Sequence, residues 1–202
     1  MDGIFPALLQ EGRAVVIPYL VRIYHACLST GFVPAIWQQF KVVFIPKPGR
    51  NSYSRPTDYR LFSRISFLLK TMERLVDMYL RDEALALMPL QPNQLVETAL
   101  HQLIVRVGKV LDQQETVLGV FLDIEGAFYN TCYDTMCDAL VRHGSDYTII
   151  WWIRANLEGR IGVAKLNEFS MRLVISRGCP QGGVLPPFQW CVLVDDLLAR
   201  LS

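Results

Sequence analysis

The spacing of apolar residues in the first sixty positions predicts helices followed by a strand. Residues 6–30 carry apolar side chains at helical spacing, interrupted at Gly12 and Pro18, so we expect two short helices there. The run Val-Val-Phe-Ile at 42–45 is rich in β-branched and aromatic residues and predicts a short strand that is buried on both faces. The polar stretch 51–60 indicates a loop.

Two amphipathic helices and a second buried strand are predicted next. Apolar positions recur with helical period from Ser63 to a stop before Pro89, and again from Val96 to Leu111. The segment 117–124 has the sequence Val-Leu-Gly-Val-Phe-Leu-Asp-Ile. This apolar run has the length of a strand, and we expect it to be buried on both faces.

The last third of the chain predicts helices around a β-hairpin. Helical spacing covers 133–143 and 147–157, and the second of these helices is expected to be well buried. From 161 to 175 apolar and polar positions alternate around a turn at Asn167-Glu168, which is typical of a hairpin. The apolar run 188–201 predicts a final helix. We therefore expect one compact α+β unit, with the N-terminal helices as an appendage.

Asp123 lies inside the apolar segment 117–124. Burial of an unpaired carboxylate is costly, so such a side chain usually has a cation, a metal ion or strong hydrogen-bond donors as partners. Two interpretations remain open for the residue itself. It is either a metal ligand or an acid at the end of the strand that is solvated or caps the following helix.

The charge changes sign along the chain, although the net charge is only +1. Basic residues dominate 41–70, where Asp58 is the single acid, and acidic residues dominate 82–138. This order suits a site that binds polyphosphate with one part and a divalent metal with the other, and two ordinary solvated surfaces are the alternative. The apolar fraction of 51% excludes an intrinsically disordered chain.

The five cysteines are scattered and form no CxxC pair, so we expect reduced thiols and no structural zinc. The N-terminus lacks the pattern of a signal peptide, and no apolar stretch approaches the length of a membrane span. We therefore expect a soluble intracellular protein, nuclear or cytoplasmic and not secreted.

Two loops carry residues suited to binding a phosphorylated ligand. The first is a stiff turn with its following loop, and its cations are Lys47, Arg50, Arg55 and Arg60. Such side chains donate charge-assisted hydrogen bonds to phosphate oxygens, although exposed cations are more often simply solvated. In the second, 178–183, glycines would let the backbone approach a ligand beside Gln181. A helix-entry turn, in which glycine serves only geometry, is the alternative.

Asp195 and Asp196 form the one adjacent pair of acids near the end of the chain. They lie in a run with helical period, where consecutive side chains point about 100° apart. We therefore assign them to a helix surface and not to a shared metal. The three histidines show no spacing that marks a catalytic triad or a metal site.

Five segments, in order, resemble the reverse transcriptase domain of non-LTR retrotransposons, the LINE-like elements of animal genomes. The resemblance covers nearly the whole chain from about Pro34. It rests on 42–50 (VVFIPKPGR), 58–60 with 66–76 (DYR and SFLLKTMERLV), 97–100 (ETAL), 121–128 (FLDIEGAF) and 177–185 (RGCPQGGVL). It implies the fingers and partial palm of a right-hand polymerase, with a helical extension at 1–35, a fingers-like region at 36–116 and a partial palm at 117–202.

The resemblance also implies a metal site and a reaction. Asp123 would bind the catalytic Mg²⁺, with the carbonyl oxygen of Ile124 as a further ligand. The reaction would be RNA-directed DNA synthesis by nucleotidyl transfer, with an RNA template, a DNA primer and deoxynucleoside triphosphates as partners. No membrane partner is implied, and the oligomeric state stays unknown.

Nucleotide contacts are implied for five residues. Lys47 and Arg60 would lie along the triphosphate, and Phe128 would screen the 2′-position of the sugar. Gln181 and Gly182 would contact the nucleotide and the template near the primer end. This agrees with the chemistry, because cations neutralise charge on the transferred phosphates.

The chain also departs from the family pattern. Tyr129 stands where an acid or amide usually follows the ring, Arg60-Leu61-Phe62 replaces Arg-Pro-Ile, Leu95-Val96 replaces small hydroxyl residues, and Pro186 replaces a serine. The sequence given stops at Ser202, before the second acidic strand pair. One carboxylate cannot hold two divalent ions against their hydration, so we expect little or no polymerase activity from this chain alone. A noncatalytic nucleic-acid-binding or interaction remnant, and a product that does not fold stably, are the alternatives.

Overall fold

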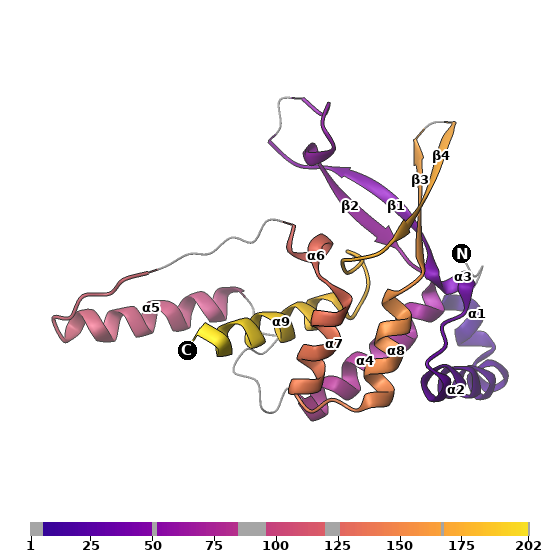
Figure 1. Cartoon of the computed structure of the whole chain (residues 1–202), viewed down its shortest axis with the longest axis horizontal. Helices are drawn as coiled ribbons and strands as arrows, with labels where there is room; N and C mark the ends of the chain where they lie inside the picture. Colours follow the sequence, from indigo (N-terminus) through magenta and orange to yellow (C-terminus); the bar gives the residue numbers. More distant parts are fainter. Residues whose placement is uncertain (1–5, 50–51, 85–95, 120–125, 167, 202) are drawn as a thin grey trace.

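The computed structural model describes residues 6–49, 52–84, 96–119, 126–166 and 168–201. Two β-hairpins stand on one side of a group of helices (Figure 1). The strands are β1 (Gln39–Pro46), β2 (Tyr59–Arg64), β3 (Arg160–Leu166) and β4 (Phe169–Ile175). The helices are α1 (Pro6–Glu11), α2 (Arg13–Thr30), α3 (Ala35–Gln38), η1 (Pro56–Asp58), α4 (Phe67–Ala84), α5 (Val96–Asp112), α6 (Ala127–Asn130), α7 (Tyr133–Arg142), α8 (Tyr147–Leu157) and α9 (Pro186–Leu201). The predicted α+β class is confirmed.

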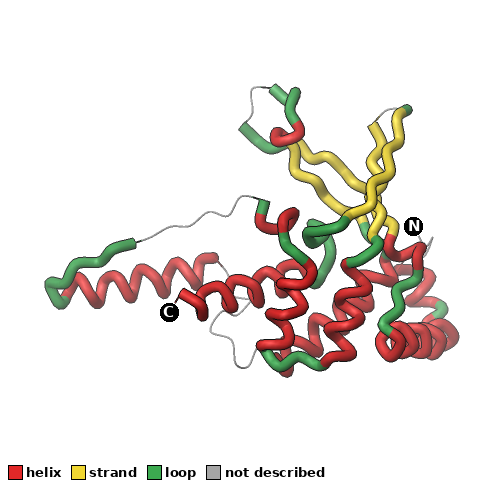
Figure 2. The backbone as a smooth tube through the Cα atoms, viewed as in Figure 1, coloured by secondary structure: helices red, strands yellow, loops and turns green. Residues whose placement is uncertain are grey.

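The four strands form one sheet in the order β2-β1-β3-β4. Strands β1 and β2 pair antiparallel, as do β3 and β4. A parallel pairing of β1 with β3 joins the two hairpins only from Gln39↔Ile161 to Val42↔Ala164. Beyond these pairs the hairpins diverge (Figure 2). The sheet is therefore continuous at its base and splits into two projecting arms.

The strand predicted at 42–45 lies within β1, but the expectation that it is buried on both faces is wrong. Val43, Phe44 and Ile45 are 43%, 39% and 44% exposed. They lie beyond the last pair with β3, on the arm where β2 is their paired neighbour. Figure 1 shows this arm standing clear of the described helices, so none of these helices covers the three side chains.

The buried strand expected at 117–124 is not found where the structure describes that segment. Val117, Leu118 and Gly119 have no regular structure, and Leu118 is 89% exposed. A strand forms when a neighbouring strand pairs with its backbone N–H and C=O groups, and the described sheet does not include these three residues. Residues 120–125 lie outside the described part of the chain.

A hydrophobic core lies among α4, α7, α8 and α9, whose apolar stripes face one another. The core side chains that are at most 1% exposed are Leu69, Met72, Leu80, Met136, Ala139, Leu140, Trp152, Ile153, Leu157, Leu185, Phe188 and Val192. Helix α2 joins this core through Tyr24, whose hydroxyl donates a hydrogen bond to Leu68 O (3.0 Å). All five cysteines are free thiols, as predicted. Within the described residues, no helix combines the length and the apolar character needed to cross a membrane.

Most predicted elements are confirmed within a few residues. The helices expected at 96–111, 133–143, 147–157 and 188–201 correspond to α5, α7, α8 and α9, and the hairpin at 161–175 corresponds to β3 and β4. The sequence pattern does not predict strand β2, because it indicates a loop over 51–60 and a helix from Ser63. Its apolar residues Leu61 and Phe62 are adjacent, so the sequence shows no period of two. Pairing with β1 establishes this strand.

The break expected at Gly12 is present, but the break at Pro18 is wrong. Helix α2 continues through Pro18, which lacks the N–H that would bond to the carbonyl of Ala14. Ala14 and Ile17 are exposed at this turn. Water can therefore satisfy the carbonyl that loses its partner, and the helix tolerates the proline.

Asp195 and Asp196 lie on α9, which confirms their helical assignment, but they do not face solvent as expected. Each side chain is 12% exposed. Arg142, near the end of α7, donates two hydrogen bonds to the carboxylate of Asp196 (2.5 and 2.9 Å). His143 Nε2 lies 3.6 Å from Asp195. The two carboxylates therefore join α9 to the C-terminal end of α7, where the helix dipole also favours a cation.

Candidate functional site

The segment Arg177–Val184, called the glycine turn below, is tied to two distant parts of the chain. On one side, the N–H of Ser63 in β2 donates a hydrogen bond to Gln181 O (2.6 Å). On the other side, Gly178 N donates to Thr131 O (2.8 Å) and Cys179 N donates to Phe128 O (2.7 Å). The glycine turn is therefore held between the outer edge of β2 and the segment around α6.

Two glycines of the glycine turn are required because neighbouring backbone atoms leave no room for a side chain. Gly178 has φ +85°, and a Cβ there would lie 2.6 Å from the carbonyl oxygen of Tyr129. Gly182 has φ +115°, and a Cβ there would overlap the carbonyl oxygen of Ser63 and lie 2.9 Å from the ring of Phe62. From the sequence alone, a purely geometric role for these glycines was one of two alternatives. The structure gives both glycines a geometric role, because any side chain would separate the glycine turn from its neighbours.

The two predicted phosphate-binding cations lie on the β1–β2 arm. Arg60 is exposed and pairs with Ile45 across the arm. Lys47 follows the end of β1, and its N–H donates to Asp58 O (2.9 Å). Among the described residues, neither cation forms an ion pair. Arg60 shares a strand face with Phe62, two residues on, and Gly182 approaches that same face.

The spacing along the strands places these cations relative to the glycine turn. Ser63, which binds Gln181, pairs with Val42. Arg60 is three residues from Ser63, or about 10 Å along the strand, and Lys47 is five residues from Val42, or about 16 Å. The structure therefore brings Gly182 close to the face that carries Arg60, whereas Lys47 lies farther out on the arm.

Phe128 and its neighbour lie on α6, next to the glycine turn. The ring of Phe128 is half-buried and contacts the ring of Trp190 on α9, with a centroid distance of 5.7 Å. Tyr129, which departs from the family pattern, donates a hydrogen bond from its hydroxyl to Leu61 O of β2 (3.4 Å). The contacts of Trp190 and Tyr129 were not expected from the sequence.

A buried cluster of three polar residues, Glu73, Asn156 and Arg160, supports the glycine turn at its C-terminal end. Glu73 of α4 is 0% exposed; its Oε2 accepts a hydrogen bond from Val184 N (2.7 Å), and its Oε1 accepts one from Asn156 Nδ2 (3.1 Å). Arg160 Nε donates to Asn156 O, and another guanidinium nitrogen lies 3.7 Å from Glu73. Burial lowers the pKa of Arg160, and the negative charge of Glu73 opposes this shift.

One feature of the sequence points to this cluster. Glu73 has helical spacing with Leu69, Met72 and Val76, so an acid interrupts the apolar stripe of α4. A carboxylate at such a position requires a buried partner. Arg160, immediately before a hairpin strand, showed no comparable pattern.

The predicted metal ligands Asp123 and Ile124 lie outside the described residues. Within the described ranges, no group of three or more His, Cys, Asp or Glu side chains is arranged to hold a metal ion. The acids near the glycine turn and the arm have other partners, since Glu73 binds Val184 N–H and Asp58 binds Arg55 N–H (2.9 Å). The described side chains therefore supply no substitute for Asp123.

Cys179 and Cys132 are expected to differ strongly in reactivity. Burial raises the pKa of the Cys179 thiol from 9.0 to about 11, whereas hydrogen bonds from the backbone N–H groups of Thr135 and Asp134 lower the pKa of exposed Cys132. At pH 8, iodoacetamide should therefore label Cys132 first and Cys179 last, as measured by peptide mass spectrometry. Comparable rates in the folded chain would contradict this, and comparable rates in urea are the control.

The raised pKa of Cys179 also has a consequence for stability. The thiol ionises in the unfolded chain near its ordinary value of 9.0, and in the folded chain only near 11. Its stabilising contribution is complete below pH 9 and is lost as the pH rises toward 11, because only the unfolded state then releases the proton.

Comparison with known proteins places these features in a family. Residues 45–202 match the family model described as reverse transcriptase (RNA-dependent DNA polymerase). A putative 115 kDa protein in the type-1 retrotransposable element R1DM of Drosophila melanogaster is 26% identical over 210 residues, which cover 100% of this chain. The probable RNA-directed DNA polymerase from transposon BS of the same organism is 29% identical over 206 residues, or 98% of this chain.

A third relative is the Pol polyprotein from the type-1 retrotransposable element R2 of Popillia japonica, 27% identical over 181 residues and 87% of this chain. The chain spans 20%, 22% and 25% of the length of these three curated relatives. The family match covers most of the chain and includes β2, α6 and the glycine turn. The resemblance to non-LTR retrotransposon proteins is thereby confirmed, and the chain belongs to the reverse transcriptase family.

Proposed function

We propose that this chain supplies the nucleotide-binding and template-binding surface of an RNA-directed DNA polymerase of a non-LTR retrotransposon. The reaction is template-directed nucleotidyl transfer, in which the 3′-oxygen of a primer attacks the α-phosphate of a deoxynucleoside triphosphate and pyrophosphate leaves. The observation that carries the proposal is the hydrogen bond from Ser63 N–H to Gln181 O. It fixes the glycine turn beside the strand that carries Arg60.

Arg60 and Lys47 are proposed to bind the triphosphate. Both are on the projecting arm, and Arg60 is exposed on the face that Gly182 approaches. A guanidinium can bind phosphate oxygens bidentately, and an ammonium on a flexible stem can reach a more distant phosphate. Charge neutralisation by these two groups would favour the departure of pyrophosphate.

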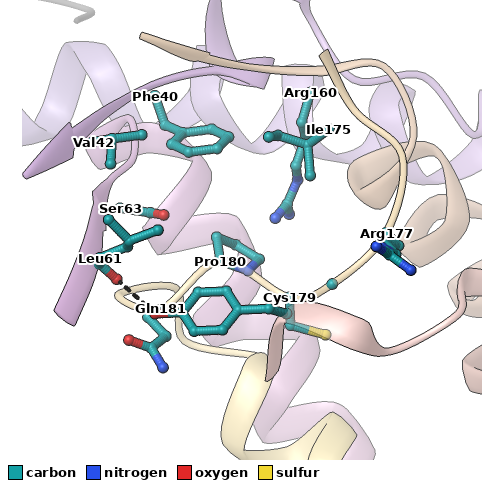
Figure 3. Close-up of a pocket in the computed structure, with 12 residues that line it drawn as sticks. Phe40, Val42, Leu61, Ser63, Arg160, Ile175, Arg177, Cys179, Pro180 and Gln181 are labelled. Carbon is teal, nitrogen blue, oxygen red and sulfur yellow. Dashed lines mark hydrogen bonds between the residues drawn. The ribbon is translucent and has the colours of Figure 1, made fainter. Parts of the chain in front are cut away.

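Gln181, Gly182 and Phe128 are proposed to orient the nucleotide at the other side of the site. The side chain of Gln181 points away from Arg160 (Figure 3), and its amide can both donate and accept hydrogen bonds. The ring of Phe128 is supported by Trp190, which limits its movement. A ring held in this way suits the proposed role of screening the 2′-position of the sugar.

Mg²⁺ is the proposed cofactor, with the carboxylate of Asp123 and the carbonyl oxygen of Ile124 as its ligands from this chain. When bound, it would neutralise phosphate charge and lower the pKa of the primer hydroxyl. The described residues would contribute the cations and the glycine turn to that site. An RNA template and a DNA primer are the proposed macromolecular partners. We also propose that 36–116 form the fingers-like region and that 117–202 form the partial palm.

Titration of the chain with a fluorescent deoxynucleoside triphosphate in the presence of Mg²⁺ tests the proposal. Arg60→Ala and Lys47→Ala should each weaken binding by about tenfold, because each removes a charge-assisted hydrogen bond. Arg22→Ala is the matched control, since Arg22 is an exposed cation on α2, away from the arm.

Fluorescence anisotropy gives the affinities, and an equal loss in all three variants would indicate nonspecific charge effects and contradict the site. Binding of single-stranded RNA should be measured in parallel over a range of salt concentrations. Intact RNA binding with no nucleotide binding in the unmodified chain would favour a noncatalytic nucleic-acid-binding protein over the proposed function.

A further inference from the structure

A cavity of about 100 Å³ lies between the base of the sheet and the glycine turn. Phe40 and Val42 of β1, Leu61 of β2 and Ile175 of β4 form its apolar walls, and Pro180 closes it from the glycine turn. Figure 3 shows these side chains around a common space. Gln181 also lines the cavity, but Figure 3 shows its side chain pointing away from Arg160, and the proposed contacts Lys47, Arg60 and Phe128 are not among the described lining residues.

Arg160 gives this apolar cavity a polar group. The residue is 3% exposed, and Figure 3 shows its guanidinium pointing into the cavity toward Pro180 and Cys179. Its Nη1 is buried and has no hydrogen-bond partner among the described residues. A buried donor without an acceptor costs free energy, so this nitrogen favours a ligand that brings an acceptor.

The charges next to Arg160 determine which acceptor fits, because the other cation that lines the cavity, Arg177, is exposed to solvent. Glu73 already lies 3.7 Å from the guanidinium, and the thiol of Cys179 stays neutral because burial raises its pKa. A carboxylate ligand would therefore place a second negative charge beside Glu73 and would have to lose its hydration. A neutral carbonyl oxygen satisfies Nη1 without that cost.

The size of the cavity limits the rest of the ligand. An engineered protein cavity of about 150 Å³ accommodates benzene. A cavity of about 100 Å³ that is bordered by the 41%-exposed Tyr129 can take most of a single ring, with the remainder at the mouth. A planar ring also matches the flat apolar walls formed by Phe40 and Pro180.

We propose that this cavity is a binding site for a small, neutral, single-ring molecule with a carbonyl group, such as an aromatic amide or a lactam, whose oxygen accepts a hydrogen bond from Arg160. The site goes beyond the proposed function and does not depend on it. Because β1, β2 and the glycine turn all line the cavity, a bound ring packs against all three at once. Ligand binding therefore stabilises the position of the glycine turn.

Benzamide is the probe for this site. Titration of the full chain, followed by two-dimensional NMR, should give saturable shifts at Gly178–Gln181 and intermolecular contacts from the benzamide ring to the methyl groups of Ile175. The thermal unfolding midpoint should rise with benzamide concentration. Toluene, which lacks the acceptor, and benzoate, which is charged, should each bind at least tenfold more weakly.

Two matched variants localise the binding. Val42→Phe fills the cavity and should abolish the benzamide effects, whereas Val43→Phe makes the same change at the next residue, on the opposite face of β1, and should preserve them. Circular dichroism establishes that each variant is folded. The comparison of benzamide with toluene uses the unmodified chain and does not depend on either variant.

Three results would each overturn the proposal. No saturable benzamide signal in the unmodified chain would mean that the cavity holds only water. Equal affinities for benzamide and toluene would mean that Arg160 does not select the ligand. Unchanged binding in a folded Val42→Phe variant would place the site elsewhere.

Discussion

Glu73→Ala is expected to lower the free energy of unfolding by about 3–5 kcal/mol. The substitution removes the carboxylate that accepts hydrogen bonds from Val184 N–H and from the side chain of Asn156. It also leaves the buried guanidinium of Arg160 without its negative partner. Urea unfolding followed by circular dichroism measures the loss, with the slope of the transition checked for a change in the unfolded state.

Two further substitutions separate the sources of this loss. Glu158→Ala removes a carboxylate of an exposed pair with Arg154 on α8, and it should leave the unfolding midpoint within experimental error. Glu73→Gln retains an acceptor but removes the charge, so its loss should lie between those of the other two variants. A loss for Glu73→Ala no larger than that for Glu158→Ala would show that the buried polar cluster does not support the glycine turn.

The sequence predicted the helical half of the fold better than the sheet. Helices α7, α8 and α9 each have a continuous apolar stripe, and the spacing of apolar residues within the segment is enough to predict the helix. The sequence therefore predicts the positions of these helices within a few residues. Strand β2 depends on pairing with β1, and its adjacent Leu61 and Phe62 give no local alternation. Burial of 42–45 was overestimated for a related reason, since the sequence does not specify how far β3 follows β1.

The candidate site was likewise only partly predictable from the sequence. The order of the motifs predicts roles for Gln181, Gly182 and Phe128, and the structure brings their segments together through the hydrogen bonds of the glycine turn to β2 and α6. The supporting contacts could not be predicted in the same way. The hydrogen bond from Tyr129 to Leu61 spans 68 residues, and the one from Asn156 to Glu73 spans 83. The position of Glu73 in the apolar stripe of α4 predicts a buried partner, but no periodic pattern in the sequence identifies which residue that partner is.

The position of the glycine turn depends as much on missing side chains as on hydrogen bonds. At Gly178 two separate costs would meet in a single substitution. The positive φ disfavours any residue with a Cβ, and the carbonyl oxygen of Tyr129 occupies the space that the Cβ needs. Backbone atoms cannot move aside as a flexible side chain can, so α6 and the glycine turn would have to separate. That movement would break the bond from Gly178 N–H to Thr131 O.

Gly178→Ala is therefore expected to lower the free energy of unfolding by about 2–5 kcal/mol, from the left-handed backbone and from overpacking together. Gly144→Ala isolates the first cost, because Gly144 has φ +73° and open space around its Cβ position, and it should lose only about 1–2 kcal/mol. Gly108→Ala, in α5 with open space and no positive φ, should instead gain about 0.5–1 kcal/mol. Urea unfolding of the three variants gives the order. If Gly178→Ala lost no more than Gly144→Ala, the close contact between α6 and the glycine turn would be disproved, and with it the geometry that brings Phe128 and Gln181 to one site.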